Sequence, residues 1–323
     1  MLLEVLEAAN RIESGESLAI AGDASVMSQL PKGRWIGGSI PYFMGERGTT
    51  TRQLVFATSL PGSPEEVVIK EYDASGLSSI HTDAPDNGYS LIIIPFGSQV
   101  HRRFAQDAPE YPEAFLKPLV GWISGMHLDD WGKAAPLAYS GLTGRSYTNS
   151  AVSMHVRLPK TQLAQVGTIN LFEPGEGDDI SFDEEGFDIG ECLVNGSARN
   201  FADYLEQMGV DTRWPLVANY AGTRINVSFQ RLDTTAKRVH LYAPVFRHVT
   251  YRLAAPLNRP YVDAYRDAVK DAHYSFACSC ILNYLHGSLE GSQVEGAHGP
   301  ATFGEIAHQL LNQTTVYLEI TEQ

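Results

Sequence analysis

A cysteine-containing segment near the end of the chain carries the residues best suited to chemistry. The segment FACSCILNYLHGSLEG covers residues 276–291 and contains Cys278 and Cys280. If the chain through Cys280 forms a strand, these two side chains point to the same face, where both thiols can meet a ligand, a metal or an oxidant. A zinc site would need two further ligands at fixed geometry. The competing interpretation is that both thiols are small hydrophobic residues of the core.

A second cluster lies in VEGAHGPATFGEIAHQLL, residues 294–311. The spacing predicts a helix over Phe303–Leu311, on which Glu305 and His308 share a face, so that a carboxylate and an imidazole converge on one ligand. Thr302 and Glu305 also match the capping box, which would use the Glu305 carboxylate to satisfy the start of that helix. Both a ligand-binding and a structural role are therefore open for Glu305.

A third candidate is PLVGWISGMHLDDW, residues 118–131. Trp122 and Gly125 stand where a strand is expected to end. Glycine beside an aromatic ring at such a place lets a ligand approach the backbone closely. The alternative is that Trp122 packs in the core.

The motifs of common enzymes are missing from this sequence. It contains no phosphate-binding G-x-x-x-x-G-K-[ST] loop, no G-x-S-x-G elbow, no H-E-x-x-H helix and no C-x-x-C pair. We therefore expect no enzyme, no catalytic residue and no metal site. A hydrolase with a Cys/His pair is the alternative, and it requires a reactive thiol at Cys278 or Cys280.

The pattern of apolar residues predicts an α+β fold. Tyr89–Pro95 is apolar enough for a central strand, and Val100–Asp107 fits a helix. A turn at Asn195-Gly196 is expected to precede a helix from Ser197 to Met208. The alternating runs between Leu216 and Leu253 predict an antiparallel sheet. We expect two mixed modules, with largely antiparallel or mixed sheets flanked by helices.

An acidic stretch suggests a boundary between the modules. Residues 173–191 are rich in Asp and Glu and lack Lys and Arg. They do not supply both the Gly and the Glu of a calcium-binding EF-hand loop, which favours an acidic linker between modules 1–172 and 192–323. We expect this linker to pair with a basic run in the second module, made up of Lys237, Arg238, His240, Arg247, His248 and Arg252.

The composition limits the classes of partner. The 38 acidic and 24 basic residues among 323 give a formal charge of −14, which argues against binding to nucleic acid. No apolar run approaches the roughly 20 residues of a membrane helix, so no membrane insertion is expected. The first residues contain Glu4 and Glu7 and no basic start, unlike a signal peptide. Three cysteines at no disulfide-framework spacing suit a reducing compartment, and we expect a cytoplasmic protein.

The second half of the chain resembles FIST domains. The resemblance rests on NGSARNFADYLEQMG, FACSCILNYLHGSLEG and GPATFGEIAHQLLNQTTVYLEI within residues 189–323. They supply a cysteine-bearing strand, a later G-E-I segment and a closing strand after an N-x-T step. GRWIGGSIPYF and PLVGWISG resemble the glycine-containing strands of the FIST N-terminal region. Many FIST domains place an arginine shortly after the cysteine, whereas Cys280 is followed by Ile281, Leu282 and Asn283.

The resemblance implies a function as well as a fold. It implies a cytoplasmic sensory module that binds a small molecule, such as an amino acid or a similar metabolite, and signals through a separate partner protein. The family cysteine corresponds to Cys278 or Cys280, and the G-E-I segment to Gly304, Glu305 and Ile306. Some relatives bind haem and sense nitric oxide. The alternative is therefore a haem or redox sensor that uses one of those cysteines or one of His286, His298 and His308.

Overall fold

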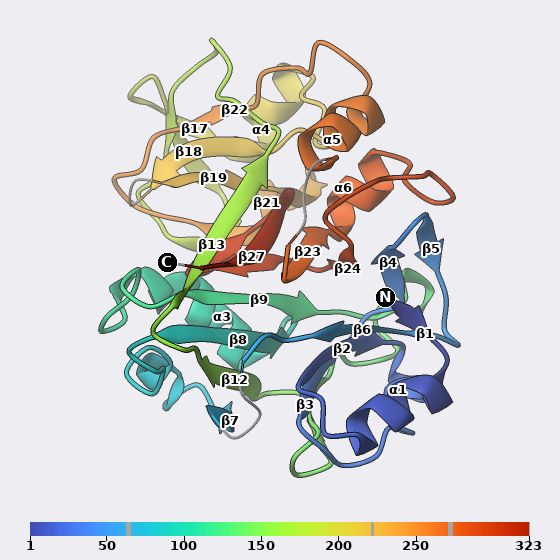
Figure 1. The fold of residues 1–323 in the computed structure, drawn as a ribbon. Coiled ribbons are helices and arrows are strands. Elements are labelled where there is room, and N and C mark those ends of the chain that lie inside the picture. The colour runs from blue at the N-terminus through green and yellow to red at the C-terminus, as the bar shows by residue number, and fades with distance from the viewer. Residues whose placement is uncertain (63–65, 221–222, 271–273, 323) are drawn as a thin grey trace.

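The computed structural model describes residues 1–62, 66–220, 223–270 and 274–322, which form a mixed α/β fold with several sheets (Figure 1). The helices are α1 (Val5–Glu13), α2 (Ala24–Met27), α3 (Gln99–Asp107), α4 (Phe201–Gln207), α5 (Tyr261–Val269) and α6 (Ile281–His286). Most strand pairs are antiparallel, with parallel pairs at β2/β3, β8/β9 and β23/β24. The expected α+β class with mixed sheets is confirmed.

Two sheets are built mainly from the first half of the chain. In spatial order, the first contains β1 (Leu2–Leu3), β6 (Val55–Ser59), β2 (Leu18–Gly22), β3 (Trp35–Ser39), β10 (Ala138–Ser140) and β11 (Arg145–Tyr147). The second contains β26 (Gln309–Leu311), β25 (Glu305–Ala307), β9 (Leu119–Ser124), β8 (Gly88–Pro95), β12 (Ala151–Arg157) and β7 (Val67–Tyr72). Every residue of β8 is buried, as its apolar run predicts.

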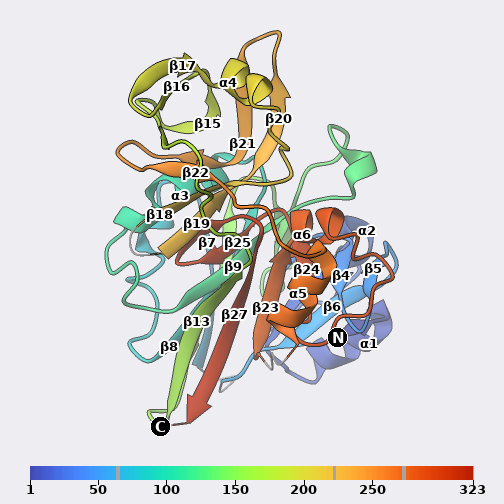
Figure 2. The ribbon, with the colours of Figure 1, turned by 90° about the horizontal axis from the view of Figure 1, so that it is seen from above.

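A third sheet joins the two halves of the chain. Its order is β13 (Gln162–Asn170), β27 (Thr314–Glu322), β23 (Phe276–Cys280), β24 (Gly299–Thr302), β4 (Tyr42–Met44) and β5 (Gly48–Thr50). The long β13/β27 ribbon crosses the middle of the molecule in Figure 1. Figure 2 shows α5 and α6 side by side next to β23 and β24. The C-terminal strands therefore complete sheets that begin in the N-terminal half.

The remaining sheets lie in the second half. One contains β17 (Ser197–Asn200), β16 (Glu191–Val194), β14 (Ile180–Ser181), β22 (Tyr251–Leu253), β18 (Leu216–Tyr220) and β19 (Thr223–Val227). The other contains β15 (Gly186–Ile189), β21 (Arg238–Val245) and β20 (Phe229–Asp233). The antiparallel pairing predicted between Leu216 and Leu253 is confirmed.

The acidic stretch 173–191 contributes strands β14 and β15 to these sheets. Its carboxylates pair with the basic run, as expected: Asp179 lies 2.6 Å from Arg252 and Asp188 lies 2.8 Å from Arg238. Lys237 instead pairs with Asp203 on α4. The boundaries at 172 and 192 stay a prediction.

Two predicted helices are wrong or displaced. Phe303–Leu311 forms the hairpin β25/β26, because β25 pairs with β9 and the segment is buried almost throughout. Pairing to a central strand outweighs a helical spacing of apolar residues. Thr302 and Glu305 therefore form no capping box. The helix expected from Ser197 begins at Phe201, since 197–200 pair with β16 after the Asn195-Gly196 turn and Asn200 caps α4.

One continuous hydrophobic core extends through both halves of the chain, and a smaller one lies beneath α1, between this helix and the sheet that contains β2 and β3. None of the helices in the described parts of the chain has the length and apolar composition needed to cross a membrane.

Candidate functional site

The two thiols lie at the end of a central strand. β23 is flanked by β27 and β24, and it ends at Cys280, directly before α6 begins at Ile281. Cys278 and Cys280 are both buried and neither forms a disulfide. Because they are two residues apart on a strand, they share a face, as predicted.

The opposite face of β23 anchors the strand through a buried polar network. Ser279 accepts a hydrogen bond from Tyr265 on α5 at 3.1 Å and another from Asn283 on α6 at 3.1 Å. Asn283 also donates to the carbonyl of Thr314 at 3.0 Å. These bonds connect β23, α5, α6 and β27, so the thiols are held on a rigid support.

Glu305 lies beside the thiols although it is not on a helix. It belongs to β25, where it stands opposite Trp122 of β9. Its side chain is fully buried, and Oε2 accepts hydrogen bonds from the Thr314 backbone N–H at 3.2 Å and hydroxyl at 2.8 Å. Oε1 has no hydrogen-bond partner among the described residues. Burial raises the pKa of Glu305 to about 8, so this carboxyl is mostly protonated at neutral pH.

Burial also keeps both thiols protonated. It raises the pKa of Cys278 and Cys280 well above the ordinary thiol value, and the neighbouring Glu305 carboxyl adds to the rise. The Cys278 thiol donates to the Gly121 carbonyl at 3.3 Å. Backbone N–H groups of Gln313 and Leu282 face the Cys280 sulfur and oppose the rise. A thiol must ionise to act as a nucleophile, so this environment disfavours a reactive cysteine.

A narrow pocket reaches Cys280 from the surface. About 30 Å³ is open to the centres of water-sized groups, which suits one small group at its inner end. Its walls combine residues from both halves of the chain: Leu128, Trp131, Tyr242, Cys280, Ile281, Leu282, Leu285, Phe303 and Asn312. We call this the Cys280 pocket. The buried Asn312 side chain donates through Nδ2 to the Leu311 carbonyl, and its Oδ1 has no partner among the described residues.

An outer hollow of about 560 Å³ shares Leu128, Trp131 and Tyr242 with the Cys280 pocket and adds Gln230 and Arg231. The two spaces therefore adjoin. A ligand with one end in the narrow pocket has room for a larger part outside it.

Four aromatic rings gather around the mouth of the Cys280 pocket. Trp131 stacks on Phe303 with ring centroids 6.1 Å apart, and Phe96 contacts both of these rings and Tyr242 at 5.4–6.4 Å. Trp131 is 46% exposed, so its ring is accessible to a ligand at the mouth of the pocket. Phe303 packs directly on the backbone of Gly125, where an added Cβ would lie 2.4 Å from the ring.

The structure brings some of the predicted site residues together and separates others. Cys278, Cys280 and Glu305 form one cluster. Trp122 is buried beside them and stacks on Phe276, so its role here is packing. Gly125 contributes by leaving room for the ring of Phe303, which lines the Cys280 pocket. Gly304 connects β24 to β25, and its carbonyl accepts from Ile123 at 2.8 Å.

His308 does not reach the cluster. It occupies the turn of the β25/β26 hairpin with a left-handed φ of 61°, and its N–H bonds the Leu119 carbonyl at 2.9 Å. Its ring contacts Phe115. Leu119 and Trp122 lie at different points along β9, so Glu305 and His308 do not converge on one ligand as the helical spacing predicted.

Sequence reasoning missed Trp131, Tyr242, Phe303 and Asn312 as pocket residues. Trp131 follows two aspartates in a loop after η4 (Leu128–Asp130), an unusual setting for a core tryptophan and the one local signal available. Tyr242 on β21 and Asn312 before β27 reach the pocket only through long-range strand pairing.

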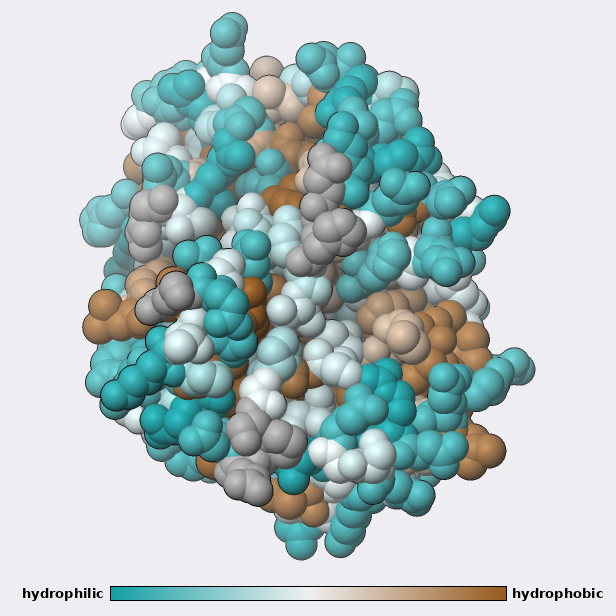
Figure 3. Space-filling model, in the orientation of Figure 1, coloured by the Kyte–Doolittle hydropathy of each residue, from teal (hydrophilic) through white to brown (hydrophobic). Residues whose placement is uncertain are grey.

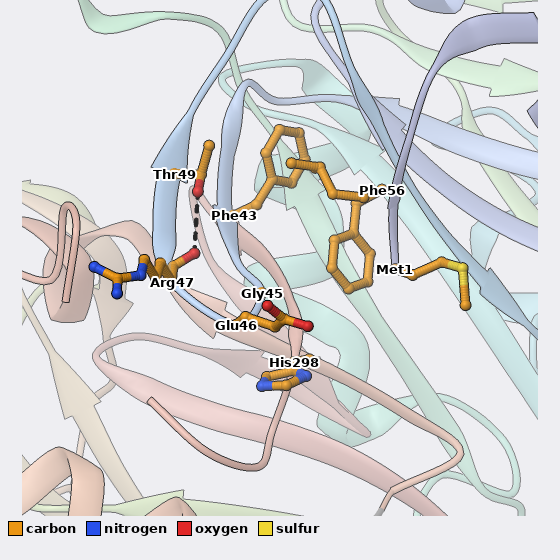
Figure 4. A pocket seen from close by; sticks show the side chains of 9 residues that line it. Met1, Phe43, Gly45, Glu46, Arg47, Thr49, Phe56 and His298 are labelled. Atoms are coloured by element: carbon orange, nitrogen blue, oxygen red, sulfur yellow. Dashed lines mark hydrogen bonds between the residues drawn. The ribbon is translucent and has the colours of Figure 1, made fainter. Parts of the chain in front are cut away.

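A second hollow of about 560 Å³ lies beside β1, β4 and β5 (Figure 4). The rings of Phe43 and Phe56 form its floor, and the Glu46 carboxylate lies next to the exposed ring of His298. An apolar area is visible in this region at the right of Figure 3. Its charged residues are exposed, and no buried polar side chain is aimed into it from the described residues that line it.

The described residues contain no group of three or more His, Cys, Asp or Glu side chains placed to hold a metal ion. A haem bound through Cys280 does not fit the narrow pocket in this conformation. His286 lies at the end of α6, where burial lowers its pKa, and only His298 of the three candidate histidines lines one of the hollows described above.

A family model covers almost the whole chain. No curated protein matches this chain. A family model described as a family of unknown function, DUF6976, matches residues 3–321. The match covers both halves of the chain and every residue of the Cys280 pocket. The chain therefore belongs to the DUF6976 family.

Proposed function

We propose that this protein is a sensory protein of the FIST type that binds a small molecule in the Cys280 pocket and signals through a separate partner protein. The observation that carries the proposal is an unsatisfied buried polar atom, Asn312 Oδ1, on a residue that lines an aromatic pocket. Asn312 Oδ1 is buried without a partner among the described residues, and an unsatisfied buried polar atom is costly to a fold. A ligand reaching Asn312 would supply a missing hydrogen bond.

The position of the pocket fits a sensor. Leu128 and Trp131 come from the first half of the chain, and Tyr242, Leu285 and Phe303 come from the second. A ligand held between them contacts both halves, so binding can change how the halves pack, which a partner protein can detect. The buried, unpaired cysteines agree with a reducing compartment, and we propose a cytoplasmic location.

A screen of metabolites by thermal denaturation tests the proposal. A true ligand raises the midpoint of unfolding of the wild-type protein by mass action. Trp131→Ala should abolish that rise, because Trp131 forms the mouth of the pocket and is exposed enough for the variant to fold. Leu142→Ala, at a site that is 60% exposed and outside the pocket, is the matched control and should keep the rise. Turnover of a substrate at this site would overturn the proposal.

The hydrolase alternative has less support from the geometry. It needs a thiolate next to a histidine, whereas Cys280 has Glu305 and backbone N–H groups around its sulfur and a raised pKa. Labelling of Cys280 by a thiol reagent at neutral pH as fast as a free thiol would revive it.

The haem-sensor alternative has one observation in its favour. His298 lines the hollow over Phe43 and Phe56, which is large enough for a sizeable flat ligand. A haem bound there would supply gas-binding or redox chemistry, and His298, Phe43 and Phe56 are the residues that would hold it. A Soret band after haem addition that disappears in His298→Ala would favour this function, and an unchanged spectrum would exclude that site.

A further inference from the structure

The Cys280 pocket also indicates the chemical class of its ligand, an inference that rests on the proposed function. The amide oxygen Oδ1 of Asn312 can only accept hydrogen bonds, and it has no partner among the described residues, whereas Nδ2 donates to the Leu311 carbonyl at 3.0 Å. Cys280 lines the same space, and the buried carboxyl of Glu305 lies on the far side of its sulfur. The unsatisfied Asn312 Oδ1 at this end of the pocket therefore requires a donor from the ligand.

The walls of the pocket favour a cation. Trp131, Tyr242 and Phe303 line the space, and Phe96 connects their rings. Aromatic rings attract an ammonium group through the negative charge on their faces, and several rings around one space form an aromatic cage. Their apolar surface also suits the methylene groups that follow an ammonium group.

The charges around the pocket also favour a cationic ligand. The described lining of the Cys280 pocket contains no Lys, Arg or His. The basic residue of the outer hollow, Arg231, is bonded to Asp233 at 3.1 Å and to His240 at 2.7 Å. The chain as a whole carries a formal charge of −14, which raises the local concentration of small cations.

We propose that the ligand carries a primary ammonium group, which enters the Cys280 pocket first and donates to Asn312 Oδ1 between the aromatic rings. The carboxyl of Glu305 lies behind Cys280 and is mostly protonated at neutral pH, so the attraction to the ammonium group comes from Asn312 Oδ1 and the faces of the aromatic rings. The remainder of the ligand extends into the outer hollow past Gln230 and Arg231.

Isothermal titration with four small probes tests this class: n-butylamine, n-butanol, butyrate and γ-aminobutyrate. We expect n-butylamine to bind in the roughly millimolar range suited to five heavy atoms, and butanol and butyrate to bind at least tenfold more weakly. Asn312→Leu and Trp131→Ala should each weaken n-butylamine at least tenfold. Asn219→Leu, an exposed asparagine on β18, is the matched control and should leave binding unchanged.

γ-Aminobutyrate distinguishes a simple amine from an amino acid. Binding tighter than that of n-butylamine, with the gain lost in Arg231→Ala, would show that the ligand carries a carboxylate at its outer end and would still support the ammonium group. Binding of butanol or butyrate in place of the amines, with loss in Trp131→Ala, would overturn the ammonium class and leave the binding pocket in place. Failure of both amines to bind, while another metabolite stabilises the protein through Trp131, would also overturn it.

Discussion

The fully buried carboxyl of Glu305 makes a prediction about stability that is independent of any ligand. Glu305→Gln keeps the shape of the side chain and an oxygen that can accept the bonds from Thr314, but it removes the ionisable group. The carboxyl has a pKa of about 8 in the folded protein, compared with the ordinary glutamate pKa of 4.5 that we take for the unfolded chain. Between pH 4.5 and pH 8, Glu305 therefore releases its proton in the unfolded chain and keeps it in the folded protein.

The sign of the effect follows from this difference. A raised folded pKa gives stability that is fully present below the unfolded pKa and is lost as the pH rises toward the folded pKa. The free energy of unfolding of the wild type should fall, relative to that of Glu305→Gln, by about 1.4 kcal/mol per pH unit between about pH 4.5 and pH 8. From pH 4.5 to pH 7 the relative loss reaches about 3 kcal/mol.

Urea denaturation followed by tryptophan fluorescence at several pH values measures this difference. The matched control is Glu319→Gln on β27, an exposed carboxylate that stays in water in both states. The Glu305→Gln and wild-type curves should diverge with rising pH, and the Glu319→Gln curve should stay parallel to the wild type. Parallel curves for Glu305→Gln would show that Glu305 is not protonated in the folded protein, and the reasoning would be refuted.

Three further predictions concern acid, packing and thiols. Burial lowers the pKa of His101 to about 3 and those of His81 and His155 to about 4, so their contribution to stability is present above about pH 6.5 and lost as the pH falls toward 4. In urea denaturation, the three histidines together should lower the free energy of unfolding by about 4 kcal/mol for each unit that the pH falls in this range. A free energy of unfolding that does not change with pH in this range would show that the three rings are not buried in their neutral form. Gly125→Ala should lower the free energy of unfolding by about 1–3 kcal/mol in thermal denaturation, because the added Cβ would clash with the ring of Phe303. Gly177→Ala is the control, since an added Cβ there has no atom within 4 Å, and it should leave stability unchanged. Equal effects of the two substitutions would contradict this packing. Peptide mass spectrometry after alkylation of the native protein should show slow labelling of Cys280, which lines a pocket. Labelling of Cys278 should be slower still, because its thiol donates a hydrogen bond to the Gly121 carbonyl. Faster labelling of Cys278 than of Cys280 would contradict the burial of the two thiols.

Local sequence signals account well for the elements that carry the thiols. The apolar run Tyr89–Pro95 predicts the central strand β8, and the two-residue spacing of Cys278 and Cys280 predicts their shared face. Both features depend on a few neighbouring residues, so they can be predicted without knowing the rest of the fold.

The position of Glu305 could not be predicted from the local sequence. Its spacing to His308 suggested a helix, but the segment is a hairpin whose position is determined by pairing with β9, nearly two hundred residues earlier in the chain. Glu305 reaches the thiols through that pairing, and the same pairing takes His308 away from them. Long-range strand pairing leaves little trace in a local pattern, because a short strand and a helical turn use the same apolar residues.

The aromatic walls could not be predicted for the same reason. Trp131, Tyr242 and Phe303 lie in three separate segments, and only the complete fold brings them to one pocket. The resemblance to FIST domains implies a role for the cysteines and the G-E-I segment, and the pocket beside Cys280 adds the residues that a ligand would contact first.

The central claim, that the Cys280 pocket holds a small molecule, is tested most directly by native mass spectrometry of the protein as purified, beside Trp131→Ala prepared in the same way. We expect the wild type to carry a non-covalent mass of metabolite size that is lost on denaturation and is missing from Trp131→Ala. The same added mass on both proteins would place the ligand elsewhere and contradict the claim, and a haem-sized mass would point to the hollow beside His298 instead.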